Sequence, residues 1–189
     1  FRLAQSFDRA SANPAEQAYA RLMTPVIKYW NCKIAPPLIN EAMECMGGNG
    51  YVEEGNHARH FRESPLNAIW EGSGNVMCLD VLRVLARDGS AIEAVLSSLE
   101  RDLGGESAGK TVDVIRTAAS MALRDEGSAR ILTEQLALTA AAAELRRLGM
   151  TRIADAFTET RLGGLWRSTY GMLDSRQDAG AILQELFPA

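Results

Sequence analysis

Residues 69–83 read IWEGSGNVMCLDVLR, and a GGNGY segment precedes them at residues 47–51. Glu71 stands in this stretch between a bulky indole and a Gly-Ser-Gly turn that opens an apolar helix. Such a carboxylate is either a first-turn residue stabilised by the positive end of the helix dipole, or a catalytic base at a loop-to-helix junction, where glycines let a cofactor approach the backbone. The spacing by itself leaves both interpretations open.

The pattern of apolar residues predicts helices along the whole chain. Apolar and polar residues nowhere alternate with period two for long, so strands are poorly supported. The expected fold class is therefore all-α. The expected helices span residues 14–34, 38–46, 75–87, 90–103, 111–124, 128–148, 151–173 and 178–187.

Prolines and glycines set the expected ends of these helices. Pro36-Pro37 are expected to break the first helix, and Gly47-Gly48 to end the second as a C-cap. Residues 49–70 are rich in Gly, Asn and Pro and are expected to be irregular. Ser90 and Glu93 form a capping box that opens a new helix after residue 89. We expect a boundary there, between units spanning residues 1–89 and 90–189.

Composition is that of an ordinary globular protein. The 189 residues can bury one good core or two small ones, and 47% are apolar and 23% charged. No apolar run approaches the length of a membrane span, so no membrane contact is expected. The chain starts Phe-Arg-Leu-Ala-Gln, without an initiator Met or a signal sequence. We therefore expect the C-terminal part of a longer, cytoplasmic protein.

The cysteines and histidines predict neither disulfides nor a metal site. Cys32, Cys45 and Cys78 lie in apolar settings without metal-ligand spacing, and we expect reduced thiols in the core. His57 and His60 lack Cys or carboxylate partners at ligand spacing and are expected in a surface turn.

Two motifs together resemble the C-terminal domain of the acyl-CoA dehydrogenase family. That family carries a Gly-Gly-x-Gly-Tyr/Phe turn, then an Arg-Asp-like step, then Ile-Tyr-Glu-Gly-Thr before its last core helix. The counterparts here are residues 47–51, Arg62-Glu63 and residues 69–73. Trp70 in place of Tyr, and the residues that follow this motif, resemble the AidB-like branch, the DNA-alkylation-response flavoproteins. The resemblance is strongest over residues 37–88.

The resemblance implies the C-terminal helical bundle of the acyl-CoA dehydrogenase fold, followed by a helical extension in residues 90–189. It also implies an FAD-dependent oxidoreductase that removes the α-proton of an acyl-CoA thioester while the β-hydrogen leaves as hydride to the flavin. Mapped onto this chain, Glu71 would be the base, and its own N–H would stabilise charge on the thioester oxygen. The indole of Trp70 and the apolar helix would desolvate the carboxylate and raise its pKa. Some family members carry the base on an earlier helix, in which case Glu71 only lines the cofactor.

The same resemblance assigns residues to FAD. Gly47 and Gly48 match a turn that approaches the adenosine half of FAD bound by a neighbouring subunit, which implies a homo-oligomer, a tetramer as in the family. Most walls of the FAD and thioester sites would then lie outside this chain, so the chain alone is expected to be colourless and inactive. The residues that match the flavin-lining segment are Ile69, Trp70, Gly72, Ser73 and Asn75.

Duplex DNA is a second partner implied by the resemblance, because AidB-like proteins are understood to bind DNA through their C-terminal region. Residues 91–189 hold eleven Lys and Arg against fourteen Asp and Glu, whereas a phosphate-binding surface needs a local basic excess. The better local candidate is the stretch from Arg146 to Arg176, with six Arg against three acids, so DNA contact requires that folding sorts its acids to another face. The candidate contacts are Arg146, Arg147, Arg152, Arg161, Arg167 and Arg176.

Three functions remain open from the sequence. The first is FAD-dependent dehydrogenation of an acyl-CoA. The second is duplex DNA binding in the alkylation stress response, with residual dehydrogenase activity. The third is a helical oligomerisation module. Flavin reduction by acyl-CoA and salt-sensitive retention of DNA distinguish them.

Overall fold

The computed structural model describes residues 1–163, 170–171, 173 and 176–188. Over these residues the chain is helical without a strand, so the all-α expectation is confirmed. The elements are α1 (Arg2–Arg9), α2 (Pro14–Cys45), α3 (Gly48–Tyr51), α4 (Asn56–Glu63), η1 (Ser64–Ala68), α5 (Gly74–Arg87), α6 (Gly89–Leu103), α7 (Ala108–Arg124), η2 (Glu126–Ser128), α8 (Ala129–Arg147), α9 (Thr151–Phe157), η3 (Thr158–Leu162) and α10 (Ala179–Leu186). In the described part of the chain, no helix combines the length and apolarity that crossing a membrane requires.

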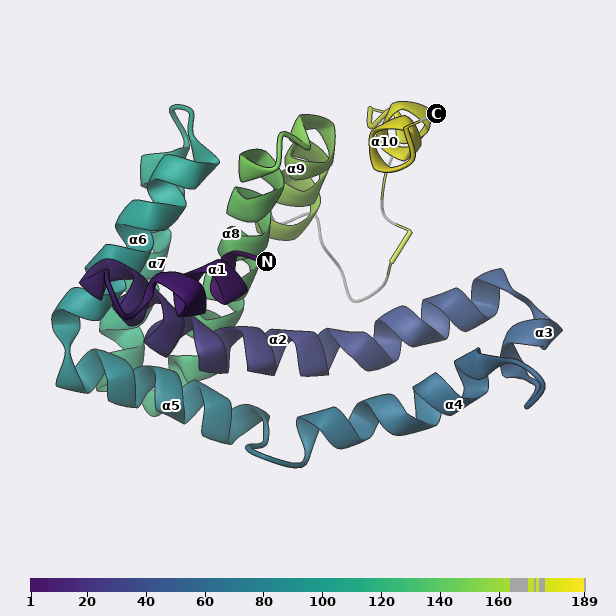
Figure 1. The fold of residues 1–189 in the computed structure, drawn as a ribbon, viewed down its shortest axis with the longest axis horizontal. Coiled ribbons are helices and arrows are strands. Elements are labelled where there is room, and N and C mark those ends of the chain that lie inside the picture. Colours follow the sequence, from purple (N-terminus) through teal and green to yellow (C-terminus); the bar gives the residue numbers. More distant parts are fainter. Residues whose placement is uncertain (164–169, 172, 174–175, 189) are drawn as a thin grey trace.

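One hydrophobic core joins the first half of α2 to α5, α6, α7 and α8 (Figure 1). It draws buried side chains from both sides of residue 89, so the expected units 1–89 and 90–189 share this core, and the boundary stays a proposal. Its fully buried members include Leu22, Met23, Val26, Val81, Leu96, Ile115, Leu132 and Leu136.

The second half of α2 leaves this bundle and pairs with α3, α4 and η1 in an arm, residues 34–68 (Figure 1). The expected break at Pro36-Pro37 is wrong, because α2 continues through both prolines to Cys45. Each proline lacks an N–H and costs the helix one hydrogen bond. Packing of this half of α2 against α4 and η1 retains the helical path despite that loss.

The expectation that residues 49–70 are irregular is also wrong, because α3, α4 and η1 lie in this part of the chain. The residues that suggested a loop stand at the ends of these elements, where helices tolerate them. Gly55 is the N-cap of α4, and Pro65 lies in the first turn of η1. His57 and His60 consequently lie on a helix and not in a turn.

Two smaller expectations need correction. Asp88 caps α6, since its carboxylate accepts a hydrogen bond from the Ser90 N–H at 2.9 Å, and the capping box is absent. The partner of Glu93 is Arg116 on α7. Of the cysteines, Cys78 is buried in the core as expected, while Cys45 is exposed at the end of the arm.

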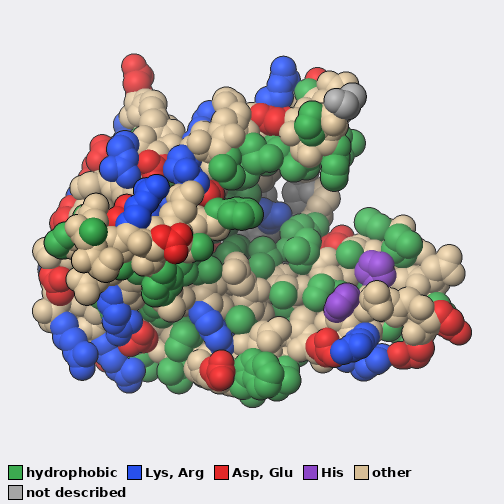
Figure 2. Space-filling view, in the orientation of Figure 1, with side chains coloured by type: hydrophobic (Ala, Val, Ile, Leu, Met, Phe, Trp, Pro, Cys, Tyr) green, Lys and Arg blue, Asp and Glu red, His purple; other side chains and the backbone are tan. Residues whose placement is uncertain are grey.

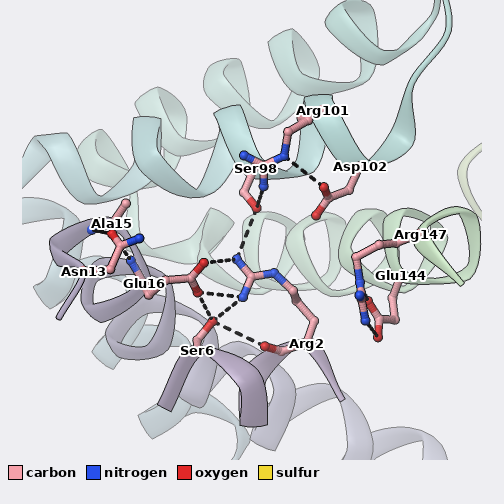
Figure 3. Close-up of polar contacts among 10 residues, drawn as sticks. All are labelled: Arg2, Ser6, Asn13, Ala15, Glu16, Ser98, Arg101, Asp102, Glu144 and Arg147. Atoms are coloured by element: carbon pink, nitrogen blue, oxygen red, sulfur yellow. Dashed lines mark hydrogen bonds and ion pairs between the residues drawn. The ribbon is translucent and has the colours of Figure 1, made fainter. Parts of the chain in front are cut away.

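A half-buried polar cluster fixes α1 to the bundle (Figure 3). The Arg2 guanidinium donates to both Glu16 oxygens at 2.7 and 3.1 Å and to the hydroxyls of Ser6 and Ser98 at 2.5 and 3.3 Å. It also lies 4.1 Å from the centre of the Tyr19 ring. The hydrogen bond from Arg2 lowers the pKa of Glu16. This pair therefore stabilises the fold above the ordinary pKa of a glutamate and is lost as the pH falls below it.

Candidate active site

The backbone at Glu71 is in an unusual conformation. Glu71 has φ of 52°, which is the left-handed region, and Gly72 follows with φ of 105°. These two residues form the connection between η1 and α5, and α5 continues along α2 in the direction that α4 takes (Figure 1). Among the described residues, Glu71 is the sole non-glycine with a positive φ. An L-residue pays about 1 kcal/mol or more for this conformation, and strain of this kind concentrates at functional sites.

Lys28 on α2 holds the strained loop. Its ammonium group donates to the carbonyl oxygens of Asn67 at 2.8 Å, Trp70 at 3.1 Å and Gly72 at 2.7 Å. The Trp70 carbonyl carbon is bonded to the Glu71 nitrogen, and the Gly72 carbonyl lies one residue beyond Glu71. Lys28 carries no signal in the sequence, because a lysine that binds carbonyls of a distant loop belongs to no local motif.

Glycines allow the loop to lie flat on its neighbours. A Cβ at Gly72 would lie 2.3 Å from the Met77 methyl carbon, and a Cβ at Gly74 would lie 2.8 Å from Cε of Lys33. Both of these atoms lie at the ends of flexible side chains that can move aside, whereas the φ of 105° at Gly72 disfavours any larger residue there. Gly72 is therefore required by the backbone conformation of this connection.

The carboxylate of Glu71 faces outward. Glu71 is exposed, and its neighbours Ile69 and Trp70 are 68% and 54% exposed. The expectation that Trp70 and the following helix desolvate this carboxylate is wrong for this chain, because neither covers it. Figure 2 shows hydrophobic side chains gathered on the lower edge of the molecule, where this loop precedes α5. The site is an exposed carboxylate within an uncovered apolar surface.

The flavin-matching residues after Glu71 lie at the start of α5. Ser73 is its N-cap residue, is exposed, and makes no capping hydrogen bond with its side chain. The Asn75 side-chain oxygen accepts a hydrogen bond from Nε of Arg130 on α8 at 2.8 Å. A cavity of about 300 Å³ adjoins this contact, lined also by Cys78 and Glu126. The extension thus touches the flavin-matching segment, a contact that no sequence pattern indicated.

Gly47 and Gly48 lie apart from Glu71. Figure 1 places α3 at the far end of the arm, while the Glu71 loop lies between η1 and α5. Gly47 has φ of 58°, and its N–H donates to the Glu44 carbonyl at 3.0 Å, so it ends α2 as expected. Within one chain, these glycines and Glu71 do not form a single site.

The candidate DNA-contacting arginines are largely paired with acids. Arg146 pairs with Asp155, Arg147 binds both oxygens of Glu144 at 2.7 and 2.8 Å, and Arg176 pairs with Glu159 at 2.9 Å. DNA contact required that the acids lie on a different face from the arginines, and these three arginines do not meet that condition. Of the others, Arg161 lies over the Tyr170 ring, Arg152 is exposed, and Arg167 falls outside the described residues.

Metal ligands do not gather anywhere in the described part of the chain. No group of three or more His, Cys, Asp or Glu side chains there is arranged to hold an ion. Glu53, near the two histidines, instead forms a bidentate pair with Arg62 at 2.6 and 2.9 Å.

Comparison with known proteins gives a consistent match. Residues 3–86 match the family model described as acyl-CoA dehydrogenase, C-terminal domain. The chain is 39% identical to the putative acyl-CoA dehydrogenase AidB of Escherichia coli strain K12 over 162 residues, which are 86% of this chain and 30% of AidB. It is 36% identical over 97 residues to acyl-CoA dehydrogenase family member 11 of Caenorhabditis elegans, which covers 51% of this chain and 16% of that protein.

A solved structure extends the likeness of fold over the whole chain. The C. elegans ACDH-11 structure, in complex with C11-CoA, superposes with a TM-score of 0.68 at 24% identity, covering 100% of this chain and 37% of that one. The chain thus spans less than half the length of each of these relatives.

Proposed function

Because the chain belongs to the acyl-CoA dehydrogenase family through the C-terminal domain in residues 3–86, we propose that it completes the active site of an FAD-dependent enzyme that dehydrogenates an acyl-CoA thioester. The observation that supports this most is the strained loop that presents the exposed carboxylate of Glu71. Glu71 takes the α-proton of the substrate, and its N–H donates to the thioester oxygen as charge develops there. FAD, when bound, accepts the β-hydrogen as hydride.

The residues around Glu71 suit a flavin. Ile69 and Trp70 offer uncovered apolar surface, which a flat aromatic ring system would bury. The N-cap Ser73 leaves the first N–H groups of α5 without a side-chain acceptor, so they can donate to polar atoms of the cofactor. The residues that would hold the flavin are Ile69, Trp70, Gly72, Ser73 and Asn75.

We also propose a homo-oligomer, a tetramer as in the family, and the position of Gly47 and Gly48 supports it. If these glycines contact FAD, the cofactor belongs to another subunit, because they lie far from the Glu71 of their own chain (Figure 1). The arm also exposes large apolar side chains that an interface would cover. They are Leu38, Met46, Tyr51, Val52, Phe61 and Leu66.

The first prediction tests the proposed reaction. FAD-loaded full-length protein is mixed without oxygen with acyl-CoAs of graded chain length, and bleaching of the oxidised flavin absorbance is followed. At least one acyl-CoA is expected to reduce the flavin. The chain of residues 1–189 alone is expected to purify without flavin, because the remaining walls of the site come from elsewhere. Bound FAD that no acyl-CoA reduces would contradict the proposal.

Duplex DNA binding is the alternative function, and the ion pairs of α8 make it testable. If Arg146 and Arg147 contact phosphates, Asp155→Asn together with Glu144→Gln frees both arginines. Retention of duplex DNA should then become stronger at every sequence, while remaining sensitive to salt. Glu53→Gln, which frees Arg62 in the arm, is the matched control.

Absence of salt-sensitive retention by the full-length protein, in both wild type and the freed-arginine variant, would count against DNA as a partner. The extension would then serve packing and oligomerisation.

A further inference from the structure

No ion pair accounts for the position of the charged Lys28 side chain. It is half-buried on α2 beneath the Glu71 loop. Among the described residues, no carboxylate lies within ion-pair distance of its ammonium group. The three N–H bonds of the ammonium meet three carbonyl oxygens, those of Asn67, Trp70 and Gly72. The positive charge of Lys28 therefore interacts with backbone carbonyl groups of a single loop.

The hydrogen bond to Trp70 also fixes the direction of the Glu71 N–H. The Trp70 carbonyl and the Glu71 N–H belong to one peptide group, and the chain has no cis peptide bond among its described residues. In a planar trans peptide the C=O and N–H point in opposite directions. Because Lys28 binds the carbonyl from the α2 side, the N–H of Glu71 points away from α2.

That N–H is available to a ligand. Within the described residues, Ile69 and Trp70 donate their N–H groups to the Leu66 carbonyl, whereas Glu71 has no backbone acceptor. The bond from Lys28 to Gly72 fixes the peptide group between Gly72 and Ser73, one residue beyond Glu71. A single ammonium thus holds the peptide group that precedes Glu71 and the peptide group that follows Gly72.

We infer that Lys28 is a positioning residue for the proposed dehydrogenation, acting through Glu71. It holds the left-handed backbone of Glu71, aims the carboxylate at the substrate α-carbon and aims the N–H at the thioester oxygen. This inference rests on the proposed function, because both groups of Glu71 have these roles only in that reaction. Misplacement of reacting groups by about 1 Å lowers rates on the order of 10²-fold.

Other side chains cannot replace this arrangement. The loop packs on α2 beside Lys28 and Gly72 without room for a water molecule, so a methionine would leave the Gly72 carbonyl unpaired until the loop shifts, while the exposed carbonyls of Asn67 and Trp70 would turn to solvent. An arginine keeps the positive charge, but its planar guanidinium cannot direct three donors to three carbonyls around one point. A role that depends only on charge would survive Lys28→Arg, whereas the positioning role would not.

The test uses FAD-loaded full-length protein carrying Lys28→Met, Lys28→Arg or the control Lys110→Met, which removes a positive charge from exposed α7. Lys28→Met is expected to lower the limiting rate of flavin reduction about 10²-fold, with little change in the half-saturating acyl-CoA concentration. Lys28→Arg is expected to recover little of that rate. In a Glu71→Gln background, Lys28→Met should lower the rate little further, since both changes affect the same step.

Amide hydrogen exchange gives a second measurement that does not depend on activity. Lys28→Met should speed exchange at Ile69 and Trp70, and leave α7 unchanged. Unchanged exchange at this loop, a normal reduction rate, or losses that add fully to those of Glu71→Gln would each overturn the positioning role. If none of the acyl-CoAs reduces the flavin of the wild-type protein, the proposed function fails. Amide exchange at the Glu71 loop still decides whether Lys28 holds this loop in place.

Discussion

Glu71→Gln is expected to lower the rate of flavin reduction by acyl-CoA by about 10³-fold or more, within the range of general-base contributions, while FAD stays bound. The amide keeps the size and hydrogen-bonding capacity of the side chain but cannot accept the α-proton. The loop should stay in place, because Lys28 binds backbone carbonyls and none of its bonds involves the Glu71 side chain. Stopped-flow absorbance of the flavin at saturating acyl-CoA measures the effect.

Glu54→Gln is the matched control for this experiment. Glu54 is an exposed glutamate in the arm, and its substitution should leave the rate unchanged. A near-normal rate in Glu71→Gln with bound FAD would assign the base to another part of the full-length protein. Glu71 would then line the cofactor only, the alternative that the family resemblance leaves open.

Local signals in the sequence predicted those features of the fold that depend on neighbouring residues. Asn13 caps α2 through its side-chain oxygen, with Pro14 in the first turn. The apolar pattern after the Gly-Ser-Gly turn predicted α5 to within a residue or two. Gly47 ends α2 because its positive φ suits glycine. In each case the determining residues lie within one turn of each other.

Features that depend on tertiary contacts could not be predicted in this way. Pro36 and Pro37 are helix breakers by local rules, yet α2 persists because the arm packs along it. In the sequence, Lys28 is indistinguishable from an ordinary lysine on a helix, and its role depends on the loop that packs over it. The basic excess between Arg146 and Arg176 likewise seemed available from composition, but α8 and α9 bring Asp155 against Arg146. Contacts between separate helices or loops decide all three.

The candidate site also combines features that local sequence predicted with features that depend on tertiary contacts. The motif identified Glu71 and its glycines, since a carboxylate beside a Gly-Ser-Gly turn is visible in sequence. The exposure of Glu71 was not visible, because burial depends on what covers the loop. The contact of Arg130 with Asn75 was not visible either, because it joins α8 to the start of α5. This contact connects the extension to the segment that we propose to hold the flavin.

The shared core predicts a large effect on stability from a substitution in the extension. Leu132 on α8 is fully buried in the cluster that contains Met23 of α2 and Val81 of α5. Leu132→Ala removes apolar contacts and leaves a cavity among these helices, which costs about 2–5 kcal/mol in the free energy of unfolding. Ile131→Ala is the matched control, since the adjacent side chain is 61% exposed and its loss should change stability by about 0.5 kcal/mol or less.

Denaturant unfolding of the chain, followed by helical circular dichroism, measures both variants. The side chains of α2, α5 and α8 belong to one hydrophobic core. Leu132→Ala should therefore shift a single cooperative transition that includes residues 3–86. Hydrogen exchange should show α2 and α5 losing protection together with α8. Two separate transitions, of which only one moves, would instead mean that residues 90–189 fold as an independent unit. The destabilisation would then stop at the proposed boundary near residue 89, and the extension could be removed without loss of the Glu71 loop.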